Sequence, residues 1–298
     1  MCGIVGLFLK DDSLSPQLGG MLSEMLVTMT DRGPDSAGIA LYGASQGSSF
    51  KVTVQSDDPA NGFNGLAAHL SSATGSLCDI EEKSTHAVIT TNGSNAEKLV
   101  AHLRDAQREL RIMSTGDSME IYKEVGLPKD VAARFKINQM NGTHGIGHTR
   151  MATESAVTTM GAHPFSTGAD QCLVHNGSLS NHNSLRRRLR RNGVHIETEN
   201  DSEVAAAYLT HRMNQGRNLG GALEDSLADL DGFFTFVVGT KNGFGVLRDP
   251  IACKPAVMAE TDQYVAFGSE YRALVSLPGI DAARVWEPEP ANVYFWER

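Results

Sequence analysis

A cysteine stands one residue from the start of the sequence, which begins MCGIVGLF. Removal of Met1 would make Cys2 the N-terminal residue, so that its thiol and a free α-amine would belong to one residue. The thiol could then attack an acyl carbon while the amine, whose pKa in peptides is about 7.7–8.0, takes or relays the proton. On this residue alone, Cys2 could equally be a small apolar residue near a frayed terminus.

Three polar residues farther along have the types that would hold a small zwitterion. Arg150 closes a strand-like run and could bind a carboxylate with two hydrogen bonds, with Thr153 adding a hydroxyl. Asp201 could pair with an ammonium group if it is buried or faces a cleft. The alternatives stay open, because a lone arginine is more often in a surface ion pair and Asp201 also suits a helix cap.

Asn176 and Gly177 follow the apolar run Cys172–Val174. The Asn176 side-chain amide and the Gly177 backbone N–H could together form an oxyanion hole, which stabilises the negative charge that develops during acyl transfer. An Asn-Gly pair after an apolar strand is also the strongest short hairpin signal, so a simple turn is the other interpretation.

Regular elements near the start of the chain would position the cysteine. Ile4–Phe8 is typical of a buried strand, which would leave Cys2 at the end of a rigid element. The apolar residues of 18–29 recur at helical spacing, and we predict a core-facing helix whose methionines serve packing. Between this helix and the predicted strand Ile39–Tyr42, Thr30–Gly38 forms a loop rich in charge and glycine, where binding residues are often found.

Segment 44–142 has no catalytic spacing, and its pattern predicts an inserted α/β segment. We expect strands at Lys51–Gln55 and His86–Thr91 and helices at Gly65–Leu70 and Ala96–Ile112. Contacts that set specificity or bind a partner are expected there.

The C-terminal half contains further helices and strands. We predict helices at Asn183–Asn192, Val204–Met213, Gly220–Leu230 and, shorter, Tyr271–Ser276. We predict a hairpin of Gly232–Gly239 with Gly243–Arg248, and strands at Pro255–Met258, Tyr264–Gly268 and Asn292–Trp296. Because strands outnumber helices and include hairpins, an α+β fold is favoured over a parallel βαβ fold.

Composition limits the class of protein. With 298 residues, 41% of them hydrophobic, the chain can bury a large core. It has no apolar run of membrane-spanning length and no signal segment, so we expect a cytoplasmic protein with no membrane contact. The net charge of −9 argues against nucleic-acid binding, and the basic cluster Arg186–Arg191 is interpreted as a solvated helix face, with a docking surface as the alternative. The four widely spaced cysteines imply neither disulfides nor a metal site.

Six motifs, in order, resemble those of the class II glutamine amidotransferases. They are Met1–Gly6, Arg32–Gly38, Gly147–Thr153, Ala162–Pro164, His175–Gly177 and Asn200–Glu203. The resemblance implies an N-terminal-nucleophile (Ntn) hydrolase fold, a four-layer αββα sandwich of two antiparallel sheets. It would form one amidotransferase domain over residues 2–298, with an insertion at about 44–142.

The same resemblance implies a role for each residue that matches a family motif. Cys2 would be the nucleophile, Arg150 and Thr153 would hold the glutamine α-carboxylate, Asp201 its α-amino group, Asn176 and Gly177 the oxyanion, and His163 would lie at the edge of the site. Met151 stands where many members have Trp, which changes only the pocket wall.

The resemblance also implies a substrate and a partner. The chain would hydrolyse L-glutamine without a metal or a cofactor of its own, and it would pass ammonia to a separate synthase subunit. It is most similar to the amidotransferase subunit of glutamate-synthase-type enzymes, in particular N-methylglutamate synthase, whose partner subunit carries FMN. We expect a stand-alone subunit because no acceptor domain follows before Arg298. An N-terminal-cysteine amidase for another substrate and a non-catalytic partner subunit are the alternatives.

Overall fold

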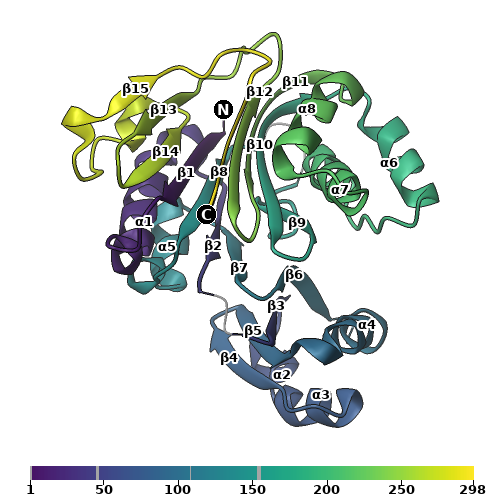
Figure 1. Ribbon diagram of the computed structural model, residues 1–298. Coiled ribbons are helices and arrows are strands. Elements are labelled where there is room, and N and C mark those ends of the chain that lie inside the picture. Colours follow the sequence, from purple (N-terminus) through teal and green to yellow (C-terminus); the bar gives the residue numbers. More distant parts are fainter. Residues whose placement is uncertain (1, 45–46, 108, 153–155) are drawn as a thin grey trace.

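Two antiparallel sheets form the centre of the molecule. The computed structural model describes residues 2–44, 47–107, 109–152 and 156–298 (Figure 1). The first sheet has seven strands among these residues. In sheet order they are β15 (Arg284–Trp286), β13 (Val257–Glu260), β14 (Tyr264–Gly268), β1 (Gly3–Leu9), β8 (His144–Arg150), β2 (Ser36–Tyr42) and β7 (Met119–Val125). β1 lies between β14 and β8, so the strand that follows Cys2 is held on both sides.

The second sheet has five strands among the described residues. In sheet order they are β16 (Val293–Glu297), β12 (Gly243–Arg248), β11 (Gly232–Gly239), β10 (Gln171–Leu179) and β9 (Phe165–Gly168). β11 and β12 form the hairpin that the sequence predicted. β10 pairs with β11 along residues 172–179, whereas β9 reaches only residues 171–173 of β10. The far half of β10 therefore has one edge without a strand partner in the described part of the chain.

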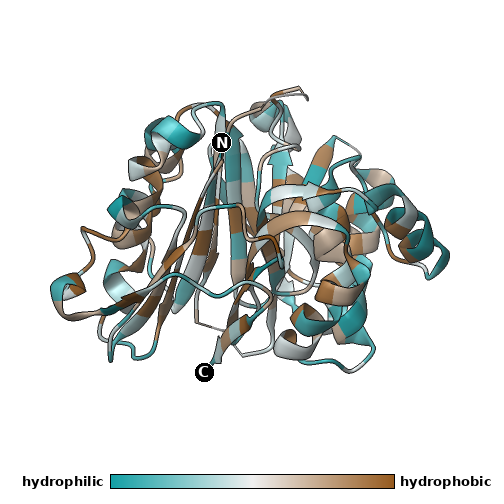
Figure 2. Ribbon diagram, turned by 90° about the horizontal axis from the view of Figure 1, so that it is seen from above, coloured by the Kyte–Doolittle hydropathy of each residue, from teal (hydrophilic) through white to brown (hydrophobic). Residues whose placement is uncertain are grey.

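Helices cover the outer face of each sheet. Helix α1 (Leu18–Thr28) and α5 (Pro128–Arg134) pack on the seven-stranded sheet, and α7 (Asp201–Asn214) and α8 (Leu219–Asp229) pack on the five-stranded sheet. Figure 2, a view from above, shows helices on the two outer sides and strands between them. Apolar side chains of both sheets, including Ile4, Phe8, Val174 and Phe244, fill the space between the inner faces. The predicted α+β fold, an αββα sandwich, is confirmed. Among the described helices, none is both long and apolar enough to cross a membrane.

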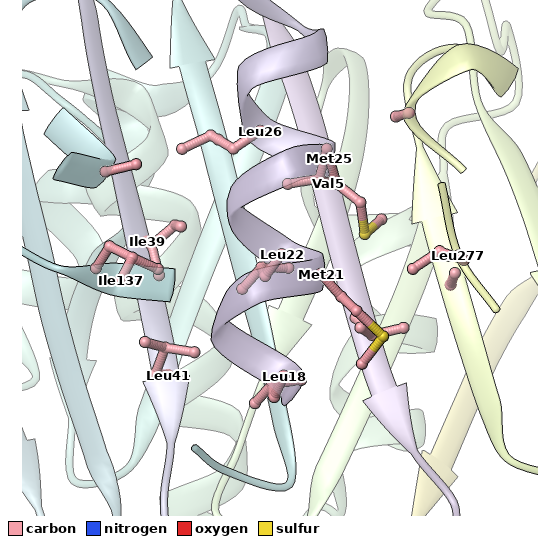
Figure 3. Packing of buried hydrophobic residues seen from close by; sticks show 14 of the residues in the cluster. Val5, Leu18, Met21, Leu22, Met25, Leu26, Ile39, Leu41, Ile137 and Leu277 are labelled. Atoms are coloured by element: carbon pink, nitrogen blue, oxygen red, sulfur yellow. The ribbon is translucent and has the colours of Figure 1, made fainter. Parts of the chain in front are cut away.

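Helix α1 fixes the position of the strand behind Cys2. Figure 3 shows its buried residues facing the seven-stranded sheet: Leu18, Met21, Leu22, Met25 and Leu26. They recur every three or four residues and pack against β1 and β2 through Val5, Ile39 and Leu41. Each such side chain contributes about 1.5–3 kcal/mol when fully buried. The predicted core-facing helix, with methionines used for packing, is confirmed.

The inserted segment contains a sheet of its own with strand order β4-β5-β3-β6. Its strands are β3 (Ser49–Ser56), β4 (Asp79–Lys83), β5 (His86–Asn92) and β6 (Leu110–Gly116), and its helices are α2 (Pro59–Gly62), α3 (Leu66–Thr74) and α4 (Ala96–Ala106). We call residues 49–116 the lobe; it lies at the opposite end of the sandwich from the N-terminus (Figure 1). β7 and α5, which also fall in segment 44–142, belong to the sandwich.

Several predicted boundaries differ from the structure. The helix predicted at Ala96–Ile112 ends at Ala106, because the residues from Leu110 onward pair with β3 as strand β6. The short helix predicted at Tyr271–Ser276 is a 3-10 turn over Tyr271–Ala273. The basic cluster lies on α6 (His182–Arg191), but Arg186 is buried there and forms an ion pair with Glu199, so its prediction as a solvated residue is wrong.

Candidate active site

Cys2 lies where the two central sheets meet. It immediately precedes β1, in which Gly3 pairs with Thr149 of β8. A Cβ atom at Gly3 would lie 2.7 Å from the Thr149 hydroxyl and 2.8 Å from Met29 Cβ, so only glycine lets the chain pass this close. The Cys2 side chain is partly exposed, and its Sγ lies 4.0 Å from the Met151 carbonyl oxygen.

The carbonyl oxygen of Cys2 accepts two hydrogen bonds from side chains of different elements. Arg32, which ends the 3-10 turn after α1, donates from Nε at 2.9 Å. Asn176, in β10 of the other sheet, donates from Nδ2 at 3.2 Å. Two donors on one carbonyl fix the plane of the Cys2–Gly3 peptide group and with it the position of the Cys2 Cα. The sequence indicated the loop that contains Arg32, but not this contact.

Asn176 and Gly177 lie inside strand β10, opposite Thr235 and Phe234. The interpretation of this pair as a simple hairpin turn is therefore wrong. Gly177 has φ +153, and a Cβ atom there would lie 2.0 Å from the Phe233 carbonyl oxygen. No other residue fits this position without moving the strand.

The Gly177 N–H points away from the neighbouring strand β11. On either side of it, the His175 carbonyl oxygen lies 3.2 Å from His148 Nε2, and the Leu179 N–H donates to Asp201 Oδ2 at 2.9 Å. Both partners lie outside β11. Because backbone groups of alternate residues in a strand point the same way, the Gly177 N–H faces the open edge of β10, on the side where Asp201 lies.

Arg150 is the last residue of β8. It follows Thr149, which pairs with Gly3, the residue next to Cys2. It pairs with Ser36 of β2, is 7% exposed, and donates from Nη1 to the Ala156 carbonyl oxygen at 3.4 Å. Its own carbonyl accepts the Asp35 N–H at 3.1 Å, which ties the end of β8 to β2. Arg150 is therefore a buried residue and not a surface one. Thr153 lies outside the described residues.

Asp201 begins helix α7, and its side chain is 23% exposed. Asn200, not Asp201, is the N-cap, because its side chain accepts the Ser202 N–H at 2.9 Å. The Asp201 carboxylate instead binds the Leu179 N–H and lies 3.9 Å from His175 Nδ1. The helix-cap interpretation of Asp201 is wrong, and its side chain stays partly accessible to solvent.

Three buried histidines lie behind these groups. The rings of His148 and His163 stack with centroids 4.1 Å apart, and His175 Nδ1 lies 2.9 Å from the Ser202 hydroxyl. Burial lowers the pKa of His148 to about 3 and that of His175 to about 4, and it lowers the pKa of His163 well below its usual range. All three rings are therefore neutral at neutral pH.

Lys123, in β7, holds the segment that contains His163. Its buried ammonium donates to the carbonyl oxygens of Ala162 at 2.8 Å and Pro164 at 3.2 Å, and it lies 4.6 Å from the centre of the Phe165 ring. Burial lowers the pKa of Lys123 to about 8. Nothing in the sequence pointed to this contact, because Lys123 falls in segment 44–142, which the sequence predicts as the insertion and in which it predicts no strand at β7.

Comparison with known proteins places these features in a family. A family model described as "Glutamine amidotransferase domain" matches residues 148–276. The "Glutamine amidotransferase-like protein GlxB" of Rhizobium meliloti is 67% identical over 297 residues, which cover 100% of this chain and 98% of that protein. A "Putative glutamine amidotransferase" of Methanothermobacter thermautotrophicus is 33% identical over 307 residues and 100% of both chains.

Solved structures show the same fold. The glutamine phosphoribosylpyrophosphate amidotransferase of B. subtilis superimposes with a TM-score of 0.62 at 19% identity, covering 99% of this chain and 47% of that one. The chain thus spans about half the length of that protein. The likeness shows that the two proteins share the αββα sandwich fold. The full-length relatives show that this chain belongs to the class II glutamine amidotransferase family, whose members hydrolyse glutamine and pass the ammonia to an acceptor domain or subunit.

Proposed function

We propose that Cys2, once Met1 is removed, is the nucleophile that hydrolyses the side-chain amide of L-glutamine. The observation that carries the proposal is the meeting of Arg32 and Asn176 on the Cys2 carbonyl, which holds the first residue of the mature chain between both sheets. A nucleophile on a rigid element keeps its geometry through the reaction. The buried histidines nearby are weak bases because burial lowers their pKa, which favours the α-amine of Cys2 as the group that takes the thiol proton.

The substrate would be held at both ends of its backbone. Arg150, buried at the end of β8, binds the α-carboxylate with two hydrogen bonds, and Thr153 adds a hydroxyl. Asp201, whose side chain is partly exposed, binds the α-amino group. His163 shapes the edge of the site as a neutral ring. This arrangement favours an amino acid whose side-chain amide extends toward Cys2.

The reaction proceeds in two displacement steps. The Cys2 sulfur attacks the amide carbon, and its proton passes through the α-amine to the departing nitrogen, which leaves as ammonia. Water then attacks the γ-glutamyl thioester, which restores the thiol and releases glutamate. In both tetrahedral intermediates the oxyanion accepts hydrogen bonds from Asn176 and Gly177. The Asn176 amide has two N–H groups, so one can stay on the Cys2 carbonyl while the other binds the oxyanion.

We also propose the acceptor. The ammonia would pass to a separate synthase subunit of the glutamate-synthase or N-methylglutamate-synthase type, with FMN on that partner and no cofactor on this chain. The motif resemblance supports this finer assignment. Co-expression with such a synthase subunit tests it: a stable complex that consumes glutamine with the acceptor is expected, and separate elution with no effect on glutamine turnover would contradict it.

Assay of glutamine hydrolysis tests the chemistry. The protein with Met1 removed should release glutamate and ammonia, and Cys2→Ala should abolish the release without lowering Tm, because the thiol is partly exposed. A large residue inserted before Cys2, which keeps the thiol but blocks the free amine, should be equally inactive. An amidase for another substrate would hydrolyse other amides and be indifferent to Asp201→Asn, and a non-catalytic subunit would be indifferent to Cys2→Ala.

A further inference from the structure

An ion pair next to Cys2 takes no part in the chemistry described above. Arg32 is 8% exposed, and while Nε binds the Cys2 carbonyl, Nη1 donates to Glu270 Oε1 at 2.6 Å. Glu270 follows β14, the strand beside β1, and is 238 residues from Arg32 in sequence. The contact to Cys2 therefore depends on a carboxylate from a distant part of the chain.

The backbone next to Glu270 is hydrogen-bonded to the start of β1. The Ser269 N–H donates to the Ile4 carbonyl oxygen at 2.9 Å, and the Ile4 N–H donates to the Ser269 hydroxyl at 2.9 Å. Glu270 is thus fixed relative to the chain only two residues from Cys2. The second carboxylate oxygen is held by Arg272 Nε at 2.7 Å, so Glu270 lies between two guanidinium groups. Its pKa is lowered, first by the hydrogen bond with Arg32.

We propose that Glu270 is a positioning residue for the nucleophile, acting through Arg32. A buried guanidinium needs a charged partner to stay in one place, and Glu270 is the carboxylate that Arg32 contacts among the described residues. With that partner removed, Arg32 would turn toward solvent or toward other acceptors. The Cys2 carbonyl would then keep only one of its two side-chain donors, the Asn176 amide.

This inference rests on the proposed function, since it concerns the placement of Cys2 as nucleophile. Glu270→Gln removes the charge and keeps the shape. It should lower kcat for glutamine about tenfold, because small displacements of a reacting group carry large rate costs. KM should stay within about twofold, because Arg150 and Asp201 are untouched. Arg272→Gln should have a smaller effect, because Arg272 is 41% exposed and reaches only the outer oxygen.

A matched control separates positioning from general loss of an ion pair. Glu260 lies in the same sheet, pairs with Lys10 at 2.7 Å, and is 24% exposed, compared with 34% for Glu270. Glu260→Gln should leave kcat unchanged. A fall in kcat equal to that of Glu270→Gln, or a fall that follows Tm in both variants, would overturn the proposal.

A double-mutant cycle tests the route through Arg32. In an Arg32→Met protein, adding Glu270→Gln should lower kcat no further, because the side chain it positions is gone. Additive losses would contradict the proposal, as would an unchanged kcat in Glu270→Gln alone. Cys2→Ala is assayed beside them: if it stays active, the proposed function fails, and if it is inactive while Glu270→Gln matches wild type, only the positioning role fails.

Discussion

The interior of the lobe consists of apolar side chains, whereas the interior near Cys2 contains many polar and charged ones. In the lobe, apolar residues from the sheet and from α3 and α4 pack together; they include Val52, Val54, Leu66, Leu70, Ile89, Leu99 and Leu103. Near Cys2, the buried residues include two arginines, a lysine, an asparagine and three histidines; they are Arg32, Arg150, Lys123, Asn176, His148, His163 and His175.

Burying side chains has a different effect on the free energy of folding in these two interiors. Apolar burial stabilises a fold without directional contacts, whereas each buried polar group must find a partner or lose free energy. Near Cys2 most of those partners are backbone carbonyls, as for Lys123 and Arg32. The difference suggests that the lobe supplies stability and contact surface, while the polar end of the sandwich gives up stability to hold its groups in one geometry. Substitutions should therefore separate stability from catalysis.

The largest effect on stability without an effect on chemistry is expected in the lobe. Leu99 of α4 is fully buried, and Leu99→Ala should cost about 2–5 kcal/mol of unfolding free energy through the lost contacts and the cavity. Urea unfolding followed by circular dichroism gives the loss, and kcat for glutamine should match wild type. Leu77→Ala, at a leucine that is 73% exposed in the same lobe, is the control and should change neither. A large fall in kcat in Leu99→Ala would break the comparison.

The reverse result is expected at Asn176. Asn176→Ala should lower kcat by roughly 10²–10³, the magnitude for one oxyanion donor, with KM much less affected. The structure adds that Asn176→Gly should be equally slow, because the residue lies in a strand and not in a turn. Kinetics and Tm are measured for all three proteins. An active glycine form beside a slow, unstable alanine form would show that Asn176 is only structural.

Low pH should lower the free energy of unfolding of the sandwich, because its buried histidines must then take up protons. His144 is fully buried, with Nε2 hydrogen-bonded to the Thr240 carbonyl at 2.8 Å and its ring stacked 4.0 Å from Tyr42, and burial lowers its pKa to about 4. In the unfolded chain the His144 ring takes up a proton near pH 6.5, whereas in the folded protein it does so only near pH 4. The free energy of unfolding is therefore at its full value above pH 6.5 and falls as the pH is lowered from 6.5 toward 4. The loss is about 3 kcal/mol.

Unfolding free energies between pH 7 and pH 4.5 test this linkage. His144→Gln, which keeps an N–H donor, should show a shallower decline than wild type, whereas the control Leu77→Ala should follow wild type. Parallel declines for His144→Gln and wild type would remove His144 as a source of acid sensitivity.

The smallest of these effects is expected for the residues that would bind the two ends of the substrate backbone, and it should appear in KM. Arg150→Lys keeps the charge but loses the two-pronged contact with a carboxylate, so KM for glutamine should rise about tenfold or more, the equivalent of one charge-assisted hydrogen bond. Asp201→Asn should raise KM similarly at the other end. Arg217→Lys, at an exposed arginine that pairs with Asp225, is the control and should leave KM unchanged. Unaltered KM in Arg150→Lys would mean that the carboxylate binds elsewhere.

Much of the fold was predictable because its signals are local. Periodicity alone identified α1, the β11–β12 hairpin and β14. The helix predicted at Ala96–Ile112 ends six residues early, at Ala106, because Leu110–Gly116 pairs with β3, more than fifty residues earlier in the chain. Sheet partners of that kind leave no trace in a single segment.

The residues of the site also fall into those that the sequence indicated and those that it did not. Cys2, Asn176 and Gly177 could be proposed because nucleophiles and oxyanion donors have recognisable residue types. Glu270 and Lys123 could not, because their roles depend on which backbone carbonyl or guanidinium a distant strand brings near them. The burial of Arg186 was missed for the same reason, since its partner Glu199 lies beyond the end of its own helix.

Covalent labelling of the protein with a diazoketone analogue of glutamine tests the central claim most directly. The reagent has the backbone of glutamine, a ketone carbon where the amide carbon would be and a diazo-bearing carbon where the amide nitrogen would be. A thiol that faces this end of the reagent gives its proton to the diazo carbon and forms a thioether with it as N2 leaves. We expect one label per chain, on Cys2, with excess glutamine slowing the labelling and Arg150→Lys weakening it. Labelling of Cys253, which is also exposed, or labelling that glutamine does not slow, would contradict the assignment of Cys2 as the nucleophile of a glutamine site.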